Sequence, residues 1–223
     1  MGFSLEDFVR EFDEWAPTYD SSVFERPSET DEVFEGYERV LAAVADAAGG
    51  RVGDVVVDVG MGTGNLSELL LQRGYRVIGV DPSPEMRKLG GQKFPTIPIL
   101  PGHFLAVPLG EGLVAAAVSS YAFHHLTDAE KTDAALELLR VVRPGGSVVV
   151  ADIAYATEAA REELFRQLAD DEGKQNLATA LQSEYYTTIE VLRDAFMTAG
   201  AASFDATRLT RFVWLLTARR DVS

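Results

Sequence analysis

A glycine-rich segment carries the most specific chemical signal in the sequence. It reads Asp58-Val59-Gly60-Met61-Gly62-Thr63-Gly64-Asn65 and lies between an apolar stretch and a helical repeat of leucines. Glycine lets the backbone turn sharply and approach a ligand closely. The free N–H groups and the positive dipole end of a following helix suit a carboxylate or a phosphate. Turns from strand to helix also need glycine for steric reasons, so the loop alone does not specify a ligand.

Asp81 supplies a second signal, at the end of the next apolar stretch. A carboxylate at that position can accept both hydroxyls of an adenosine ribose, as in NAD-binding proteins. An aspartate can also stand there for the helix dipole alone, but Ser83 already provides the N-cap, so we interpret Asp81 as a ribose ligand. The loop spacing separates two classes of site. The dinucleotide fingerprint is G-x-G-x-x-G, whereas this loop is D-x-G-x-G-x-G, with Asn65 where the third glycine would fall.

His124 and His125 are the residues best suited to proton transfer. They follow a long apolar stretch, and an imidazole titrates near neutral pH. A loop histidine also commonly serves as a structural hydrogen-bonding group or as a contact to a bound ligand. We take His124 as the candidate catalytic residue and His125 as a candidate substrate contact, and the sequence predicts no metal site.

The elements that position these residues alternate between strand and helix over residues 55–153. Strands are expected at residues 54–59, 75–80, 113–119 and 147–153. Helices between them are marked by Ser83-Pro84, by the capping box from Thr127 to Glu130, and by the stop at Pro144-Gly145-Gly146. This alternation predicts an α/β fold with a parallel sheet and helices on both faces.

The remainder of the chain departs from that alternation. Residues 154–187 are expected to be helical without a strand, and a capping box at Thr187 and Glu190 predicts a helix up to Gly200. Residues 201–209 and 211–218 are expected to form a terminal hairpin. We predict a sheet of seven strands with only the last antiparallel, within a single domain over 1–223. Its parts are an N-terminal helical extension (1–50), a core (51–153), a helical insertion (154–187) and the helix with the hairpin (188–223).

Aromatic residues at both ends of the chain are candidate pocket residues. Phe8, Phe12 and Trp15 fall on one helix face, and packing into the core is the expected role of the two phenylalanines. Trp15 and Tyr19 lie beside the turn at Pro17, so we expect them in a lid over the site. Tyr185 and Tyr186 belong to the helical insertion, and only one of two adjacent residues in an extended stretch can face a pocket.

Charge and composition exclude several functions. The chain has 20 basic against 35 acidic residues, a net charge of −15, and no run of lysine or arginine; a protein that binds nucleic acid needs such clusters. The absence of cysteine excludes catalysis by a thiolate. No apolar run is long enough to span a bilayer, and residues 1–11 lack the pattern of a signal peptide. We therefore expect a cytoplasmic protein with no nucleic-acid or membrane partner, and the oligomeric state stays open.

Taken together, these motifs resemble the class I S-adenosylmethionine (AdoMet) methyltransferases, whose Rossmann-like sheet ends in an antiparallel strand pair. The glycine loop is similar to their first motif, and residues 121–126 and 139–146 are similar to their later motifs. Residues 12–20, 81–88, 121–128, 184–186 and 212–214 resemble the YrrT-like family of bacterial methyltransferases. The resemblance implies AdoMet near Gly60 and Asp81 and an acidic residue after the third strand, where this chain has Gly102-His103. Either His103 or a backbone carbonyl would then recognise the adenine.

The predicted site follows from the loop chemistry and this resemblance. The predicted cofactor-binding residues are Asp58, Gly60, Met61, Gly62, Gly64, Asn65, Asp81, Pro82, His103, Tyr121, Trp15 and Tyr19. The predicted substrate-binding residues are His125, Tyr185 and Tyr186. The function implied is methyl transfer to a small-molecule acceptor, in line with the methyl group and in a dry pocket. Two alternatives are a non-catalytic AdoMet-binding module and an NAD-dependent oxidoreductase, which the loop spacing disfavours.

Overall fold

The computed structural model describes residues 5–25 and 29–222. One central sheet contains, in spatial order, β3 (Ile99–Pro101), β2 (Arg76–Asp81), β1 (Val55–Val59), β4 (Val114–Ser120), β5 (Val142–Tyr155), β8 (Val213–Arg219) and β7 (Ser203–Arg208). β8 is antiparallel to both of its neighbours, and the other strands run parallel to one another. The predicted α/β sheet of seven strands, with only the last antiparallel, is confirmed. A two-residue strand, β6 (Thr187–Thr188), also pairs with β5.

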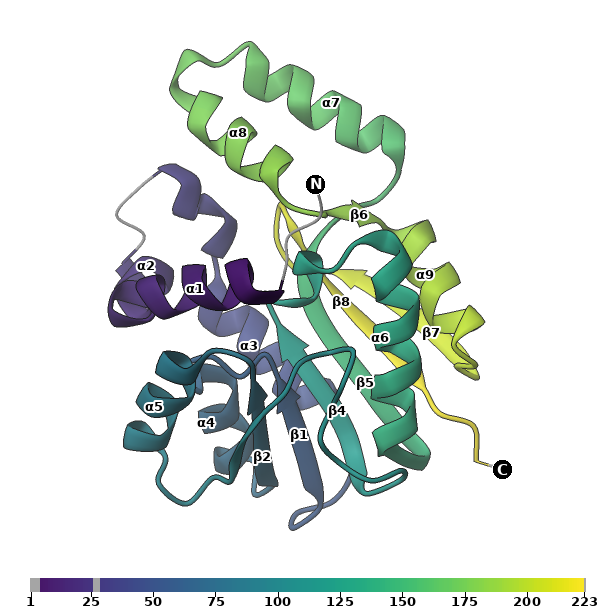
Figure 1. Ribbon diagram of the computed structural model, residues 1–223. Coiled ribbons are helices and arrows are strands. Elements are labelled where there is room, and N and C mark those ends of the chain that lie inside the picture. The colour runs from purple at the N-terminus through teal and green to yellow at the C-terminus, as the bar shows by residue number, and fades with distance from the viewer. Residues whose placement is uncertain (1–4, 26–28, 223) are drawn as a thin grey trace.

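Helices cover both faces of this sheet (Figure 1). α3 (Tyr37–Ala47), α4 (Asn65–Gln72) and α5 (Pro84–Lys93) lie on one face. α6 (Asp128–Val141) and α9 (Ile189–Thr198) lie on the other and contact each other. The central strands are buried on both sides, as in β4, where six of seven residues are buried, because a doubly covered parallel sheet has no solvent-facing side.

Local sequence signals explain where these helices begin. The Ser83 hydroxyl accepts a hydrogen bond from Met86 N at the start of α5, with Pro84 in the first turn. Thr127 and Glu130 form the predicted capping box of α6. The capping box predicted at Thr187 is wrong by one residue, since Thr188 caps α9. Thr187 is paired with Ala154 in the sheet instead, so it cannot begin the helix.

Two further segments stand near the carboxyl ends of the strands (Figure 1). The first consists of α1 (Leu5–Trp15), a short turn of helix η1 (Ala16–Thr18), α2 (Tyr19–Glu25) and η2 (Glu29–Phe34). The second consists of α7 (Glu158–Ala169), η4 (Glu172–Lys174) and α8 (Gln175–Ser183). Residues 1–4 and 26–28 of the predicted N-terminal extension lie outside the described residues. Over the rest, no helix combines the length and apolar character needed to cross a membrane.

Two predicted boundaries differ from the structure. α6 ends at Val141, and residues 142–155 then form one strand, so the Pro144-Gly145-Gly146 segment belongs to β5 rather than to a break between elements. The segment 154–187 was expected to contain no strand, yet β5 extends to Tyr155 and β6 begins at Thr187. The helical character expected between these ends is present in α7 and α8.

Candidate functional site

The glycine loop runs from the end of β1 into α4 and is held against β2. Gly60 N and Met61 N both donate to the carbonyl oxygen of Val80, at 2.8 and 3.1 Å. Gly60 has a φ of +73°, and a Cβ there would lie 2.7 Å from the Cβ of Ala122. Gly64 has a φ of +93°, and a Cβ there would lie 2.8 Å from the Phe94 ring. Only glycine fits both positions, so the backbone approaches the space above the strands without an intervening side chain.

Asp81 lies at the end of β2, and its carboxylate accepts a hydrogen bond from the glycine loop. Its Oδ2 accepts from Gly62 N at 2.8 Å, and its Oδ1 accepts from Ser83 N at 2.9 Å. Burial raises the pKa of this carboxyl to about 6, although both N–H donors act in the opposite direction. Each carboxylate oxygen has two acceptor sites, so Asp81 retains capacity for two further donors.

Asp58 is buried beneath the loop rather than exposed to the space above it. Its Oδ2 accepts from the Ser67 hydroxyl at 2.7 Å, which joins the end of β1 to the first turn of α4. Burial, with a further contribution from the Asp81 charge, raises its pKa to about 7. The Asn65 amide is also engaged away from that space, donating to Asp20 Oδ1 at 3.0 Å and to the Tyr37 hydroxyl at 3.3 Å.

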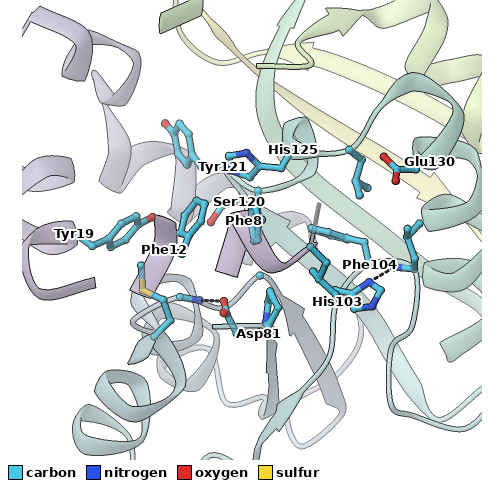
Figure 2. A pocket seen from close by; sticks show the side chains of 18 residues that line it. Phe8, Phe12, Tyr19, Asp81, His103, Phe104, Ser120, Tyr121, His125 and Glu130 are labelled. Carbon is cyan, nitrogen blue, oxygen red and sulfur yellow. Dashed lines mark hydrogen bonds between the residues drawn. The ribbon is translucent and has the colours of Figure 1, made fainter. Parts of the chain in front are cut away.

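A cavity of about 140 Å³, the first cavity, opens above the carboxyl ends of β1, β2 and β4. Figure 2 shows Asp81 and His103 at its base, with Phe8, Phe12 and Tyr19 along one side and Tyr121 and His125 above them. The predicted residues that line it are Tyr19, Gly60, Gly62, Asp81, Pro82, His103, Tyr121 and His125. The remaining lining residues are Leu5, Phe8, Phe12, Met86, Phe104, Leu105, Ser120, Ala122, Leu126 and Glu130.

His103 presents a hydrogen-bond donor to the first cavity. Its Nδ1 accepts from Leu105 N at 3.3 Å (Figure 2). In a neutral imidazole whose Nδ1 is the acceptor, Nε2 carries the hydrogen. An aspartate at this position would accept from an exocyclic amino group, whereas this imidazole would donate to a ring nitrogen. At residue 103 the ring therefore offers a donor where the resemblance implies an acceptor.

Tyr121 is held in an unusual conformation directly after β4. It has a φ of +52°, and no other non-glycine residue in the described ranges has a positive φ. Such backbone strain persists where the surroundings enforce it and is common at functional sites. Its hydroxyl is buried and has no hydrogen-bond partner within the described residues. An orphaned donor of this kind costs stability.

A second cavity, of about 120 Å³, lies beyond Tyr121. Its walls are formed by Glu11, Phe12, Trp15, Tyr19, Phe34, Tyr121, His124, His125, Ile153, Glu184 and Tyr186. Phe12, Tyr19, Tyr121 and His125 also line the first cavity. The two cavities therefore share a wall.

Each of the two adjacent histidines is paired with a carboxylate. His124 Nδ1 is 2.7 Å from Asp152 Oδ1, and the other oxygen of Asp152 accepts from His124 N at 2.9 Å. Burial lowers the pKa of His124, but the Asp152 carboxylate outweighs burial and leaves the pKa above its usual value. His125 Nδ1 is 3.1 Å from Glu184 Oε2. Burial and the neighbouring His124 lower the pKa of His125, so the pKa values of the two imidazoles are shifted in opposite directions.

Similarity to known proteins identifies the family. The profile of the methyltransferase domain matches residues 56–146. A protein of Geobacillus kaustophilus named as an uncharacterized methyltransferase is 41% identical over 97% of this chain and 99% of its own length. The chain belongs to this methyltransferase family. The narrower YrrT-like assignment stays a prediction.

Solved structures agree with the methyltransferase fold. The cyclase SpnF superimposes with a TM-score of 0.75 and 15% identity over 100% of this chain and 98% of its own. A geranyl diphosphate methyltransferase in complex with SAM superimposes with a TM-score of 0.63 and 17% identity, covering 83% of this chain and 90% of its own. At these identities the similarity concerns the fold.

The methyltransferase brings most of its sequence-predicted residues to the two cavities. Trp15, His124 and Tyr186 line the second cavity, and Tyr186 is the single member of the tyrosine pair that does so. The backbone oxygen of Tyr185 instead accepts from Lys131 Nζ at 2.8 Å. Neither cavity is lined by Asp58, Met61, Gly64 or Asn65, which support the glycine loop.

Several site residues of the methyltransferase were not identified from the sequence. Phe8 and Phe12 were expected in the core, but α1 has no buried residue and both rings line the first cavity. The 3.6-residue periodicity that marks a core-facing helix also marks a cavity-facing one. Asp152 could have been recognised as an acidic residue within an otherwise apolar strand, because an unpaired acid is rarely buried.

Two aspartates of the N-terminal segment fasten it to the glycine loop and to α5. Asp13 Oδ1 accepts from the Ser83 hydroxyl at 2.5 Å and from Glu85 N at 3.2 Å. Asp20 Oδ1 accepts from the Thr63 hydroxyl at 2.7 Å as well as from Asn65, and Asp20 Oδ2 pairs with Lys93. These contacts hold α1 and α2 over the first cavity.

Proposed function

We propose that this methyltransferase transfers a methyl group from AdoMet to a small-molecule acceptor across the wall shared by the two cavities. The first cavity would hold AdoMet and the second would hold the acceptor. The observation that carries the proposal is the shared wall of Phe12, Tyr19, Tyr121 and His125. Direct displacement needs the two reacting atoms about 3–3.5 Å apart and aligned, so the proposal requires the two cavities to connect past these side chains when both ligands are bound.

The first cavity fits AdoMet in its donors and acceptors. Asp81 would accept from both ribose hydroxyls, since its carboxylate retains free acceptor sites beside the bonds from Gly62 and Ser83. His103 Nε2 would donate to a ring nitrogen of the adenine, and Pro82 would contact the adjoining surface of the nucleoside. Gly62 lines the same cavity, and the space beside its Cα is open, since a Cβ there would meet only Met86 Sδ at 4.0 Å. AdoMet supplies a methyl group already attached to a good leaving group, the positively charged sulfur.

The residues of the second cavity would orient and activate the acceptor. Asp152 fixes the His124 ring through Nδ1, so Nε2 is the atom directed at an acceptor. Trp15, Phe34 and Tyr186 add apolar and aromatic surface around it. The modest volume of this cavity favours a small molecule over a macromolecular substrate.

The N-terminal segment would act as a lid that excludes water. α1 and α2 cover the first cavity and are fastened by Asp13 and Asp20. Opening of these contacts would widen the route by which AdoMet enters and leaves the first cavity. Such closure lowers the local dielectric and prevents hydrolysis, which favours reaction at a charged sulfur centre.

Two measurements test this proposal. Thermal melts should show stabilisation by AdoMet and not by NAD, about 2.7 kcal/mol at a ligand concentration 100 times the dissociation constant. Incubation with methyl-labelled AdoMet and a panel of metabolites should then transfer label to one chemical class. Equal stabilisation by NAD would refute the cofactor assignment. Saturable AdoMet binding with no labelled product from any acceptor class would instead favour the non-catalytic binding module.

A further inference from the structure

Three side chains with metal-binding atoms converge at the second cavity. His124 and His125 come from η3 (Phe123–His125), directly after Tyr121, and Glu184 follows α8. One ligand atom of each lies within 4.8 Å of the others. In a tetrahedral site with bonds of about 2.0–2.1 Å, two ligand atoms are about 3.3 Å apart. His125 Nδ1 and Glu184 Oε2, which are hydrogen-bonded at 3.1 Å, are close to that separation.

A second carboxylate, Asp152, holds His124 in the way that carboxylates hold metal-binding histidines. Histidines that bind metals usually donate their other ring N–H to a carboxylate, which fixes the ring and its tautomer. Asp152 has this relation to His124, at 2.7 Å from Nδ1, and is itself fixed by the backbone N–H groups of His124 and Ile153. Within residues 5–25 and 29–222, no hydrogen bond engages Nε2 of His124. That atom is therefore available to a ligand.

The charge around the cluster is negative. Glu11 and Glu184 line the second cavity and Asp152 lies behind His124, whereas the lining includes no lysine or arginine among the described residues. The nearby ammonium group of Lys131 is held by the oxygens of Leu126, Asp128 and Tyr185. With neutral imidazoles, Glu184 and Asp152 carry two negative charges and Glu11 adds a third, so a divalent cation would offset most of the charge at this cluster.

We propose that His124, through Nε2, together with His125 and Glu184 binds one divalent transition-metal ion of the zinc class, with an open coordination position toward the second cavity. Two histidines and one glutamate are a ligand set found at catalytic zinc sites. This proposal departs from the expectation of no metal that the sequence alone gave. The chain contains no cysteine, so no thiolate competes for the ion.

The proposed metal narrows the acceptor class, and this step rests on the proposed function. An acceptor hydroxyl or thiol coordinated at the open position would lose its proton to solvent near neutral pH, as metal-bound water does. The freed lone pair would form the bond to the methyl carbon while the bond from that carbon to sulfur breaks. The products are the methylated oxygen or sulfur and S-adenosylhomocysteine. His124 would then activate the acceptor through the metal.

Cobalt titration of the full-length protein, without a histidine tag and after chelator treatment, tests the site. We expect visible Co²⁺ absorption bands that saturate at a single ion per chain at micromolar concentration and are displaced by Zn²⁺. His124→Ala, His125→Ala and Glu184→Gln should each weaken Co²⁺ binding at least about tenfold, and Asp152→Asn about 10–100-fold. His103→Ala is the matched control, because the chain has 3 histidines and His103 is outside the cluster. The Glu184 side chain is 28% exposed, so Glu184→Gln leaves the core intact.

Absence of saturable binding, or equal weakening by His103→Ala, would overturn the metal site. AdoMet affinity measured on the same samples keeps the two proposals separate. Methyl transfer that persists unchanged under strong chelation would overturn the metal proposal and leave the proposed function standing. Tight Co²⁺ binding in a protein that does not bind AdoMet would support the metal site and refute the proposed function.

Discussion

Replacement of Asp81 by asparagine should weaken AdoMet binding about tenfold to several hundredfold. The ribose hydroxyls would lose two charge-assisted hydrogen bonds, each typically about 1.5–3 kcal/mol. Ionising this buried carboxyl is itself unfavourable, as its pKa of about 6 indicates, and this cost reduces the net effect. A tenfold change in affinity corresponds to about 1.4 kcal/mol. The amide has nearly the shape of the carboxylate, but its single oxygen can accept from only one of Gly62 N and Ser83 N, so a melting curve must accompany the affinity measurement.

Isothermal calorimetry at pH 8 measures this effect, with Asp46→Asn as a control because Asp46 pairs with Arg73 at the surface. The ribose is held alike in the ground and transition states. Once an acceptor is known, the loss should therefore appear in the Michaelis constant for AdoMet more than in turnover. An Asp81→Asn protein that melts cooperatively and binds AdoMet as tightly as the wild type would refute the role given to Asp81.

Four other outcomes are expected. Asp20→Ala should release the lid from Thr63, Asn65 and Lys93. If these contacts contribute about 1.4 kcal/mol, AdoMet should dissociate about tenfold faster in stopped-flow measurements. The control variant Asp46→Ala should not change the dissociation rate. Tyr121→Phe should raise the melting temperature of the ligand-free protein, because it removes an unpartnered buried hydroxyl, and should reduce the further rise caused by AdoMet. AdoMet affinity of the wild type should increase as the pH rises through about 6, because burial raises the pKa of the Asp81 carboxyl to about 6 and the ionised acceptor exists only above that pH. In Asp81→Asn the affinity should not change over this pH range. Gel-shift assays should detect no tRNA binding, given a net charge of −15.

The order of elements was predictable because hydrophobic period and capping chemistry are local. The apolar stretches of β1 and β4, the Ser83 cap and the Thr127 capping box all act within a few residues. The shift from Thr187 to Thr188 shows the limit of such signals. Thr187 fits the capping pattern, but its pairing with Ala154 and its hydrogen bond to Asp128 are tertiary contacts.

The candidate site was predictable where a motif confines the chemistry to one loop. Gly60, Gly62 and Asp81 line the first cavity because the loop and the end of β2 meet at the carboxyl edge of the sheet. Asp13 and Asp20 were not predictable, since their partners lie 43 or more residues away in the chain. The pairing of His124 with Asp152 likewise depends on the register between β4 and β5.

The most direct test of the central claim is a crystal structure with S-adenosylhomocysteine. We expect both ribose hydroxyls on the Asp81 carboxylate, the adenine beside His103, and the sulfur at the wall formed by Tyr121 and His125, facing the second cavity. A ligand bound elsewhere, or with its sulfur directed away from that wall, would contradict the account.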